Sequence, residues 1–193
     1  MDPQCVSARL QSLHHFVAPA PREDRALLRI ADRAVLDQMD RHGGVMAWSL
    51  DDTWIPNKET HSVGVARQYC GNLGKQDNCQ VALSLSLVSE AVGVPATYRL
   101  YPTKGGTTDR RRRKGAGVPS EIRLQTKWEI ALEEIDTLRT EGPSEGPIVA
   151  DAGYRPAMEI REGVTHRGLP YVMGIQCTVT LWEPCREPLR PAW

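Results

Sequence analysis

Three acidic residues stand directly after two short apolar runs of the sequence. Asp51 and Asp52 follow the run 45–50, and Asp151 follows the run 147–150. Short apolar runs predict buried strands, and functional groups in α/β sheets gather at the carboxyl ends of strands. If the two strands are neighbours, the three carboxylates converge on one spot. Converging carboxylates repel each other and raise each other's pKa unless a cation lies between them.

A group of oxygen ligands indicates a particular class of metal ion and reaction. Carboxylates without Cys or His favour Mg²⁺ or Mn²⁺. Two such ions about 4 Å apart can activate a water or hydroxyl and stabilise the leaving oxygen in phosphodiester chemistry. Aspartates at strand ends also serve as helix caps and turn formers, so spacing alone leaves both interpretations open.

The composition narrows the class of protein. The chain has 193 residues, with 24 Lys and Arg against 24 Asp and Glu, so its formal net charge is zero. This length suits one domain, and the charge balance excludes a globally basic nucleic-acid coat while leaving local patches open. No apolar run approaches the roughly 18 residues of a membrane helix, and the N-terminus shows no secretion signal. A cytoplasmic protein without membrane partners, at the nucleoid when bound to DNA, is predicted.

Zinc and disulfide chemistry are poorly supported by the sequence. The five cysteines are odd in number and include no pair at C-x-x-C spacing. His14 and His15 are adjacent, so on a helix they would point about 100° apart and could not share one ion. We therefore expect reduced and mostly structural thiols.

A strongly basic segment is predicted as a loop at 102–118. Between Arg99 and Lys114 there are seven basic residues and one acid, a local charge of +6. Such a segment could hold DNA phosphates in a salt-dependent way, and a solvated loop is the alternative. The residues concerned are Arg110, Arg111, Arg112, Arg113 and Lys114. Scattered candidates for phosphate contact are Lys58, Arg67, Lys75 and Lys127.

Around these residues, hydrophobic periodicity predicts a mixed α/β layer structure. Helices are expected at 6–17, 23–41, 120–139 and about 156–166. Strands are expected at 45–50, 61–70, 78–88, 96–101, 147–150 and 171–176, with a hairpin connection at 71–77. Trp48, Trp128 and Trp182 fall on apolar patterns and are expected in the core. Trp54 is expected in a loop at 54–60, where it could stack on a base or simply pack.

Five longer segments occur in a fixed order and carry a resemblance to a known family. They are LDDT at 50–53, HSVGVARQYCG at 61–71, GKQDNCQVA at 74–82, QTKWE at 125–129 and ADAGY at 150–154. In this order the chain resembles bacterial insertion-sequence transposases of the DDE superfamily, from about residue 8 to residue 182. The resemblance implies an RNase H-like mixed sheet flanked by helices, with one acid ending the first strand and another ending the fourth.

The resemblance also implies site residues, a cofactor and partners. Asp51, followed by Asp52 and Thr53, fits the first motif as a catalytic metal ligand. Asp52 is the runner-up, because strand alternation would turn it away from the site. Asp151 is the only candidate in the second motif. The implied cofactor is Mg²⁺ or Mn²⁺. The implied partners are DNA, as both the transposon's terminal inverted repeats and the target DNA, and a second copy of the transposase.

A third acid of the family, a glutamate on a helix beyond the last strand, has no counterpart that we can assign. Glu183 and Glu187 each precede a proline, which disfavours a helical setting. We therefore expect a chain truncated at both ends and incomplete at its C-terminus. Its expected parts are a helical lead-in at 1–44, a partial catalytic core at 45–182 and an irregular tail at 183–193. The alternative to a transposase is an inactive remnant that binds DNA or an intact transposase subunit.

Overall fold

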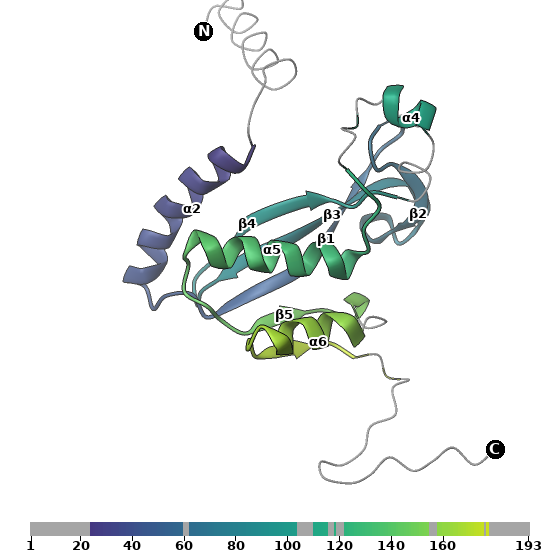
Figure 1. Ribbon diagram of the computed structural model, residues 1–193. Coiled ribbons are helices and arrows are strands. Elements are labelled where there is room, and N and C mark those ends of the chain that lie inside the picture. The colour runs from purple at the N-terminus through teal and green to yellow at the C-terminus, as the bar shows by residue number, and fades with distance from the viewer. Residues whose placement is uncertain are drawn as a thin grey trace, which may run out of the picture.

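The computed structural model of the chain describes residues 24–59, 62–103, 110–115, 118, 122–154, 158–175 and 177, and the statements below concern these residues. They form a six-stranded mixed sheet with helices packed against it (Figure 1). The strands are β1 (Ala47–Pro56), β2 (Ala66–Cys70), β3 (Lys75–Val88), β4 (Gly93–Leu100), β5 (Ile148–Ala150) and β6 (Tyr171–Met173). The helices are α2 (Asp24–Arg41), α4 (Arg110–Gly115), α5 (Lys127–Glu141) and α6 (Met158–His166). Two short 3-10 turns are η1 (Gly71–Leu73) and η2 (Ala152–Tyr154).

Strand β3 is the longest strand and organises the sheet. One of its edges pairs antiparallel with β1 along Cys79–Val88. Its other edge pairs antiparallel with β2 near one end and with β4 near the other. Beyond β1, β5 and then β6 are added in parallel. A mixed sheet of this kind with its helices is an α/β RNase H-like fold, which confirms the predicted fold class.

The core lies between the sheet and α5, which runs across the sheet in Figure 1. Trp48 and Leu50 of β1 point to this side, as do Ile130 and Ile135 of α5, and all four are at most 1% exposed. Burying a large apolar side chain contributes about 1.5–3 kcal/mol, so this contact holds α5 firmly on β1. The indole Nε1 of Trp48 also donates to the backbone oxygen of Ser144 at 3.1 Å.

The tryptophan predictions have different outcomes. Trp48 is buried in the core and Trp128 packs against it, as predicted, whereas Trp182 lies outside the described residues. Trp54 lies within β1 rather than in a loop. A Cβ atom built on Gly71 would lie only 2.8 Å from the Trp54 ring, so the indole packs directly on this glycine. The packing interpretation of Trp54 is therefore favoured over base stacking.

Strand β1 is longer than its apolar pattern predicts. We expected a strand at 45–50 and a loop from residue 54, but β1 continues to Pro56. The reason is its partner, because Asp51–Pro56 remain paired with Cys79–Ser84 of β3 after the parallel pairing with β5 has ended. The prediction of a loop is therefore wrong for residues 54–56.

The other strands are confirmed with shifted ends. Strand β2 begins at Ala66 instead of 61, β4 begins at Gly93 instead of 96, and β6 ends at Met173. The predicted hairpin joins β2 to β3, but its connection is only Gly71–Gly74. Gly74 has a φ of 63°, which a glycine adopts without strain.

Helix α5 begins later than its predicted start at 120. Its N-cap is Thr126, whose hydroxyl accepts a hydrogen bond from the Glu129 backbone N–H, while the Glu129 carboxylate accepts one from the Thr126 backbone N–H. This reciprocal capping box satisfies two backbone donors and fixes the start of the helix. Leu124, which lies within the predicted helix 120–139, precedes the observed helix and is 42% exposed.

The basic segment is also different from its prediction. Residues 110–114 were expected in a loop, but they form most of the short helix α4. The rest of the predicted 102–118 loop is described only at its beginning and at residue 118.

Helix α2 is confirmed and joins the same core. Met39 is 2% exposed within the core cluster, and the helix is followed by Gly43 and Gly44, whose φ angles of 100° and 79° end it. The predicted helix at 6–17 and the tail at 183–193 lie outside the described residues, and the proposed division into lead-in, core and tail stays a prediction. Within the described part of the chain, none of the helices has the length and apolarity needed to cross a membrane.

Candidate active site

The parallel pairing of β1 with β5 brings two of the three predicted acids together. Leu50 is paired with Ala150, so the residues that follow, Asp51 and Asp151, are next in the same register. Leu50 and Ala150 are buried, whereas both aspartates are exposed. Paired residues of neighbouring strands point to the same face, and successive residues alternate. The register therefore brings the two exposed aspartates to the same end of the β1–β5 pair, with Asp51 on the face of the sheet away from α5.

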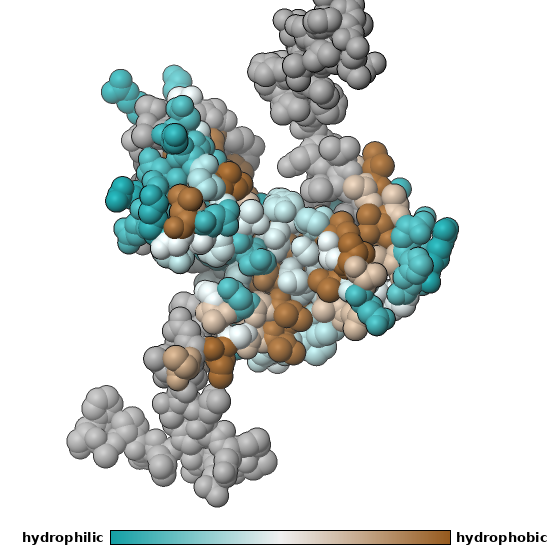
Figure 2. All heavy atoms as spheres, turned by 180° about the vertical axis from the view of Figure 1, so that it is seen from behind, coloured by the Kyte–Doolittle hydropathy of each residue, from teal (hydrophilic) through white to brown (hydrophobic). Residues whose placement is uncertain are grey.

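This face is shown in Figure 2, in which hydrophobic side chains lie among pale and hydrophilic ones. The side chains of α2, α5 and α6 that enter the core meet the opposite face of the sheet. On the exposed face, Val149 of β5 is 36% exposed and Val172 of β6 is 65% exposed. Asp51 and Asp151 thus open toward an accessible surface rather than toward the core.

Backbone hydrogen bonds orient both carboxylates in the same way. Asp51 Oδ1 accepts a hydrogen bond from the Asp52 backbone N–H at 2.8 Å. Asp151 Oδ1 accepts one from the Gly153 backbone N–H, also at 2.8 Å. In each case one oxygen is held by the local backbone, and the other oxygen makes no hydrogen bond to the described part of the chain.

Asp52 points to the other face of the sheet, as strand alternation predicts. Its side chain is only 9% exposed. Its Oδ1 accepts a hydrogen bond from the Tyr154 hydroxyl at 2.7 Å, and its Oδ2 forms an ion pair with Lys127 Nζ. Both oxygens of Asp52 are therefore engaged within the protein.

Tyr154 donates to Asp52 and lies within electrostatic range of Asp51 and Asp151. It is 4% exposed, and this burial raises the pKa of its hydroxyl well above the usual value. The negative charges of Asp52, Asp51 and Asp151 raise that pKa further. The hydroxyl therefore keeps its proton, which it donates to Asp52 Oδ1.

Lys127, at the start of α5, connects this helix to Asp52. Besides its ion pair with Asp52, its Nζ atom lies 5.7 Å from the centre of the Tyr101 ring, within range of a cation–π interaction. The side chain is 35% exposed. The sequence indicates Lys127 only as a scattered candidate for phosphate contact, whereas the structure pairs it with Asp52.

Two glycines allow close packing around Asp151, one against its carboxylate and one against the backbone that follows it. A Cβ atom on Gly153 would lie 2.9 Å from Asp151 Oδ1. A Cβ atom on Gly174, just after β6, would lie 2.8 Å from the Ala152 backbone nitrogen. Gly174 also donates its N–H to the Ala150 oxygen at 2.8 Å, so β6 supports the turn that carries Asp151.

The other predicted contact residues do not gather at the carboxylates as a group. Lys58 is exposed directly after β1, and Arg67 is exposed on β2. Lys75 forms an ion pair with Asp77 at 3.3 Å. On α4, Arg113 donates to the Ile122 backbone oxygen at 2.7 Å. Arg111 and Lys114 are exposed, and the side chains of Arg110 and Arg112 lie outside the described part.

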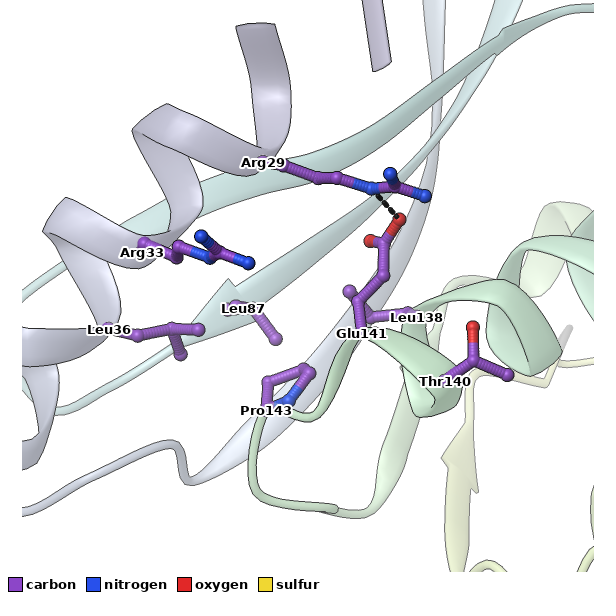
Figure 3. A pocket seen from close by; sticks show the side chains of 8 residues that line it. All are labelled: Arg29, Arg33, Leu36, Leu87, Leu138, Thr140, Glu141 and Pro143. Carbon is purple, nitrogen blue, oxygen red and sulfur yellow. Dashed lines mark hydrogen bonds and ion pairs between the residues drawn. The ribbon is translucent and has the colours of Figure 1, made fainter. Parts of the chain in front are cut away.

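A pocket lies elsewhere, between α2 and the end of α5 (Figure 3). Arg29 and Arg33 of α2 border it on one side, and Glu141 and Pro143 border it on the other. Arg29 Nε contacts Glu141 at 3.0 Å across it. None of the predicted site residues lines this pocket.

Three of the five cysteines, Cys70, Cys79 and Cys177, lie among the described residues, and Cys177 is exposed. Cys70 and Cys79 are free thiols, both buried. Burial raises the pKa of Cys79 to about 11. A protonated, buried thiol is a poor nucleophile and a poor metal ligand, so Cys79 has a structural role.

The residues that sequence reasoning missed are Tyr154 and Lys127 as partners of Asp52. Both lie within the motifs quoted above, QTKWE and ADAGY, so the signal was present. What could not be inferred is that α5 and the turn after β5 meet at one carboxylate, because that depends on the packing of three separate elements.

The donor set at the exposed edge fits a hard divalent cation. Asp51 and Asp151 offer accessible carboxylate oxygens, which Mg²⁺ and Mn²⁺ prefer, and two carboxylates leave most of an octahedral shell to water or phosphate oxygens. Among the described residues, no three or more His, Cys, Asp and Glu side chains are grouped so that they could hold a metal ion.

The described residues thus combine an RNase H-like sheet with exposed carboxylates that directly follow two adjoining parallel strands. The chain belongs to the DDE superfamily endonucleases, whose family model matches residues 4–193. It is 30% identical over 144 residues to a probable transposase for insertion sequence element IS701 from Microchaete diplosiphon. That match covers 75% of this chain and 34% of the relative, so the chain spans about a third of that relative's length. The predicted family is thereby confirmed.

Proposed function

We propose that this chain functions in DNA transposition, through divalent-metal-dependent cleavage and joining of DNA strands. The observation that carries the proposal is that Asp51 and Asp151, both exposed, directly follow the last paired residues of β1 and β5 at the same end of the strand pair. Membership in the DDE superfamily endonucleases and the likeness to a probable insertion-sequence transposase support it.

Asp51 and Asp151 would hold the Mg²⁺ or Mn²⁺ ions. Bound divalent ions supply activation of a water or 3′-hydroxyl nucleophile and stabilisation of the leaving oxygen. The protein's own part is to present both carboxylates in fixed orientation. The N–H groups of Asp52 and Gly153 do this by holding one oxygen of each carboxylate.

DNA would be bound by local basic patches, because the chain as a whole has no net charge. Lys58 and the α4 segment 110–114 are the proposed contacts to phosphates. Terminal inverted repeats as the bound sequences, and self-association at synapsis, belong to the same proposal.

Ion binding at the two aspartates tests the proposal directly. We expect Mn²⁺ to bind weakly to the chain, as measured by water-proton relaxation, and Asp51→Asn and Asp151→Asn to abolish most of this binding. The matched control is Asp40→Asn, which removes an exposed carboxylate on α2 and should bind Mn²⁺ like the original chain. Equal binding by Asp151→Asn and the original chain would remove Asp151 from the site.

A protein that binds DNA or an intact transposase subunit without cutting is the second candidate. It is favoured by the engagement of both oxygens of Asp52, which are therefore not available as further ligands beside Asp51 and Asp151. Nicking of supercoiled DNA by the chain with Mn²⁺, absent in Asp51→Ala, distinguishes the first candidate from the second.

A further inference from the structure

The separation of Asp51 and Asp151 is not fixed by the strand pairing alone. The parallel ladder between β1 and β5 ends at Leu50 and Ala150, one residue before each carboxylate. Beyond this point β1 continues beside β3, whereas the chain after β5 turns into η2. The two segments that orient the carboxylates therefore diverge at Asp51 and Asp151 themselves.

One side-chain hydrogen bond connects these diverging segments. Asp52 orients Asp51 through its backbone N–H, and its carboxylate accepts from the hydroxyl of Tyr154 at 2.7 Å. Tyr154 directly follows Gly153, whose N–H orients Asp151. The bond between Asp52 and Tyr154 thus ties the backbone that holds one carboxylate to the backbone that holds the other.

The same carboxylate also fixes these segments to α5. Lys127 Nζ pairs with Asp52 Oδ2, and Lys127 is the first residue of α5, directly after the Thr126 N-cap. Asp52 and Tyr154 are 9% and 4% exposed, for the side chain and the whole residue respectively. Charge-assisted hydrogen bonds shielded from water are stronger than neutral, exposed ones.

We propose that Asp52 is a positioning residue, which with Tyr154 and Lys127 forms a clamp that sets the spacing of Asp51 and Asp151. This inference rests on the proposed function of those two aspartates as ligands of divalent ions. Residues behind metal ligands typically change metal affinity when they are removed, because they hold the ligands in place. The clamp also explains why Asp52 is not a ligand itself, since both of its oxygens already have partners within the protein.

Tyr154→Phe is the most direct test, because it removes one hydroxyl and leaves every charge in place. We expect Mn²⁺ binding to weaken about tenfold, while thermal unfolding shows that the fold is kept. If Asp52 were a ligand, loss of the competing hydroxyl would leave Mn²⁺ binding unchanged or tighter, which would overturn the proposal. Tyr69→Phe is the control, because it removes an exposed hydroxyl on β2 and should bind Mn²⁺ like the original chain.

A double-mutant cycle checks that Asp52 and Tyr154 act through one bond. The double variant Asp52→Asn with Tyr154→Phe should bind Mn²⁺ about as weakly as Asp52→Asn alone. Fully additive effects of the two changes would show that they act independently and would contradict the clamp.

A readout without any metal separates failure of the clamp from failure of the proposed function. Hydrogen exchange at the Gly153 amide should be faster in Tyr154→Phe and unchanged in Tyr69→Phe. Unchanged exchange in Tyr154→Phe would overturn the clamp. If the original chain binds no Mn²⁺ at all, the proposed function fails, and exchange at Gly153 still decides whether the clamp exists.

Discussion

Gly153 shows how a single residue controls the orientation of Asp151. Its N–H donates a hydrogen bond to Asp151 Oδ1 at 2.8 Å. The same oxygen leaves no room for a side chain at position 153, because a Cβ atom there would lie 2.9 Å from it. Real Cβ atoms are almost never found so close to another heavy atom. An alanine at this position must displace the carboxylate.

We predict that Gly153→Ala weakens Mn²⁺ binding about tenfold while the chain remains folded. The reason is that the carboxylate has to leave the orientation set by the backbone, and supporting contacts of this kind are worth about a factor of ten in metal affinity. Titration of Mn²⁺ by water-proton relaxation measures the effect. The control is Gly93→Ala on β4, where the nearest atom to a new Cβ would be at 3.9 Å, an ordinary contact. Equal affinity of the two variants would be evidence against a fixed Asp151.

At the scale of elements, the start of α5 is set by hydrogen bonds between Thr126 and Glu129 rather than by the hydrophobic pattern. Its capping box places Lys127 at the first helical position, where it meets Asp52. The hydrogen bonds from the backbone and then the side chain of Thr126 lower the pKa of Glu129 from its ordinary value of 4.5. Glu129 is therefore ionised at a lower pH in the folded state than in the unfolded state.

We predict a pH dependence of stability from this capping box. A lowered pKa in the folded state means that the stabilisation by Glu129 is fully present above about pH 4.5 and is lost as the pH falls through the lower, folded value. The melting temperature of the original chain should exceed that of Glu129→Gln at neutral pH, and the difference should shrink below pH 4.5. Thermal unfolding followed by circular dichroism between pH 3 and 7 measures it. A difference that stays constant over this range would contradict the assignment.

The elements also show which features the sequence could predict and which it could not. The apolar runs 45–50 and 147–150 correctly predict two strands, because packing against a helix requires apolar residues within the strand's own sequence. The continuation of β1 to Pro56 has no such apolar pattern, because Asp51–Pro56 are held in the sheet by backbone pairing with β3. Likewise, the spacing after each strand indicates Asp51 and Asp151, but the partners of Asp52 come from α5 and η2, which are remote in sequence.

At the scale of the whole molecule, charge is balanced overall but unevenly distributed. With 24 basic and 24 acidic residues, the chain exerts no general attraction on DNA. Any binding to phosphates must therefore come from local groups, such as exposed Lys58 after β1 and exposed Lys114 on α4. Contacts of this type are independent of the base sequence and depend strongly on salt.

We predict that the double variant Lys58→Gln with Lys114→Gln binds duplex DNA more weakly, and by the same factor for every sequence. Each phosphate contact that is lost should reduce the slope of log affinity against log salt concentration by about 0.9, because fewer counterions are released on binding. Fluorescence anisotropy with a labelled duplex at several salt concentrations measures both quantities. Arg41→Gln is the control, since it removes an exposed positive charge at the end of α2 and should leave the slope unchanged. An equal loss of slope in the control would mean that these two lysines act only through net charge and do not contact phosphates.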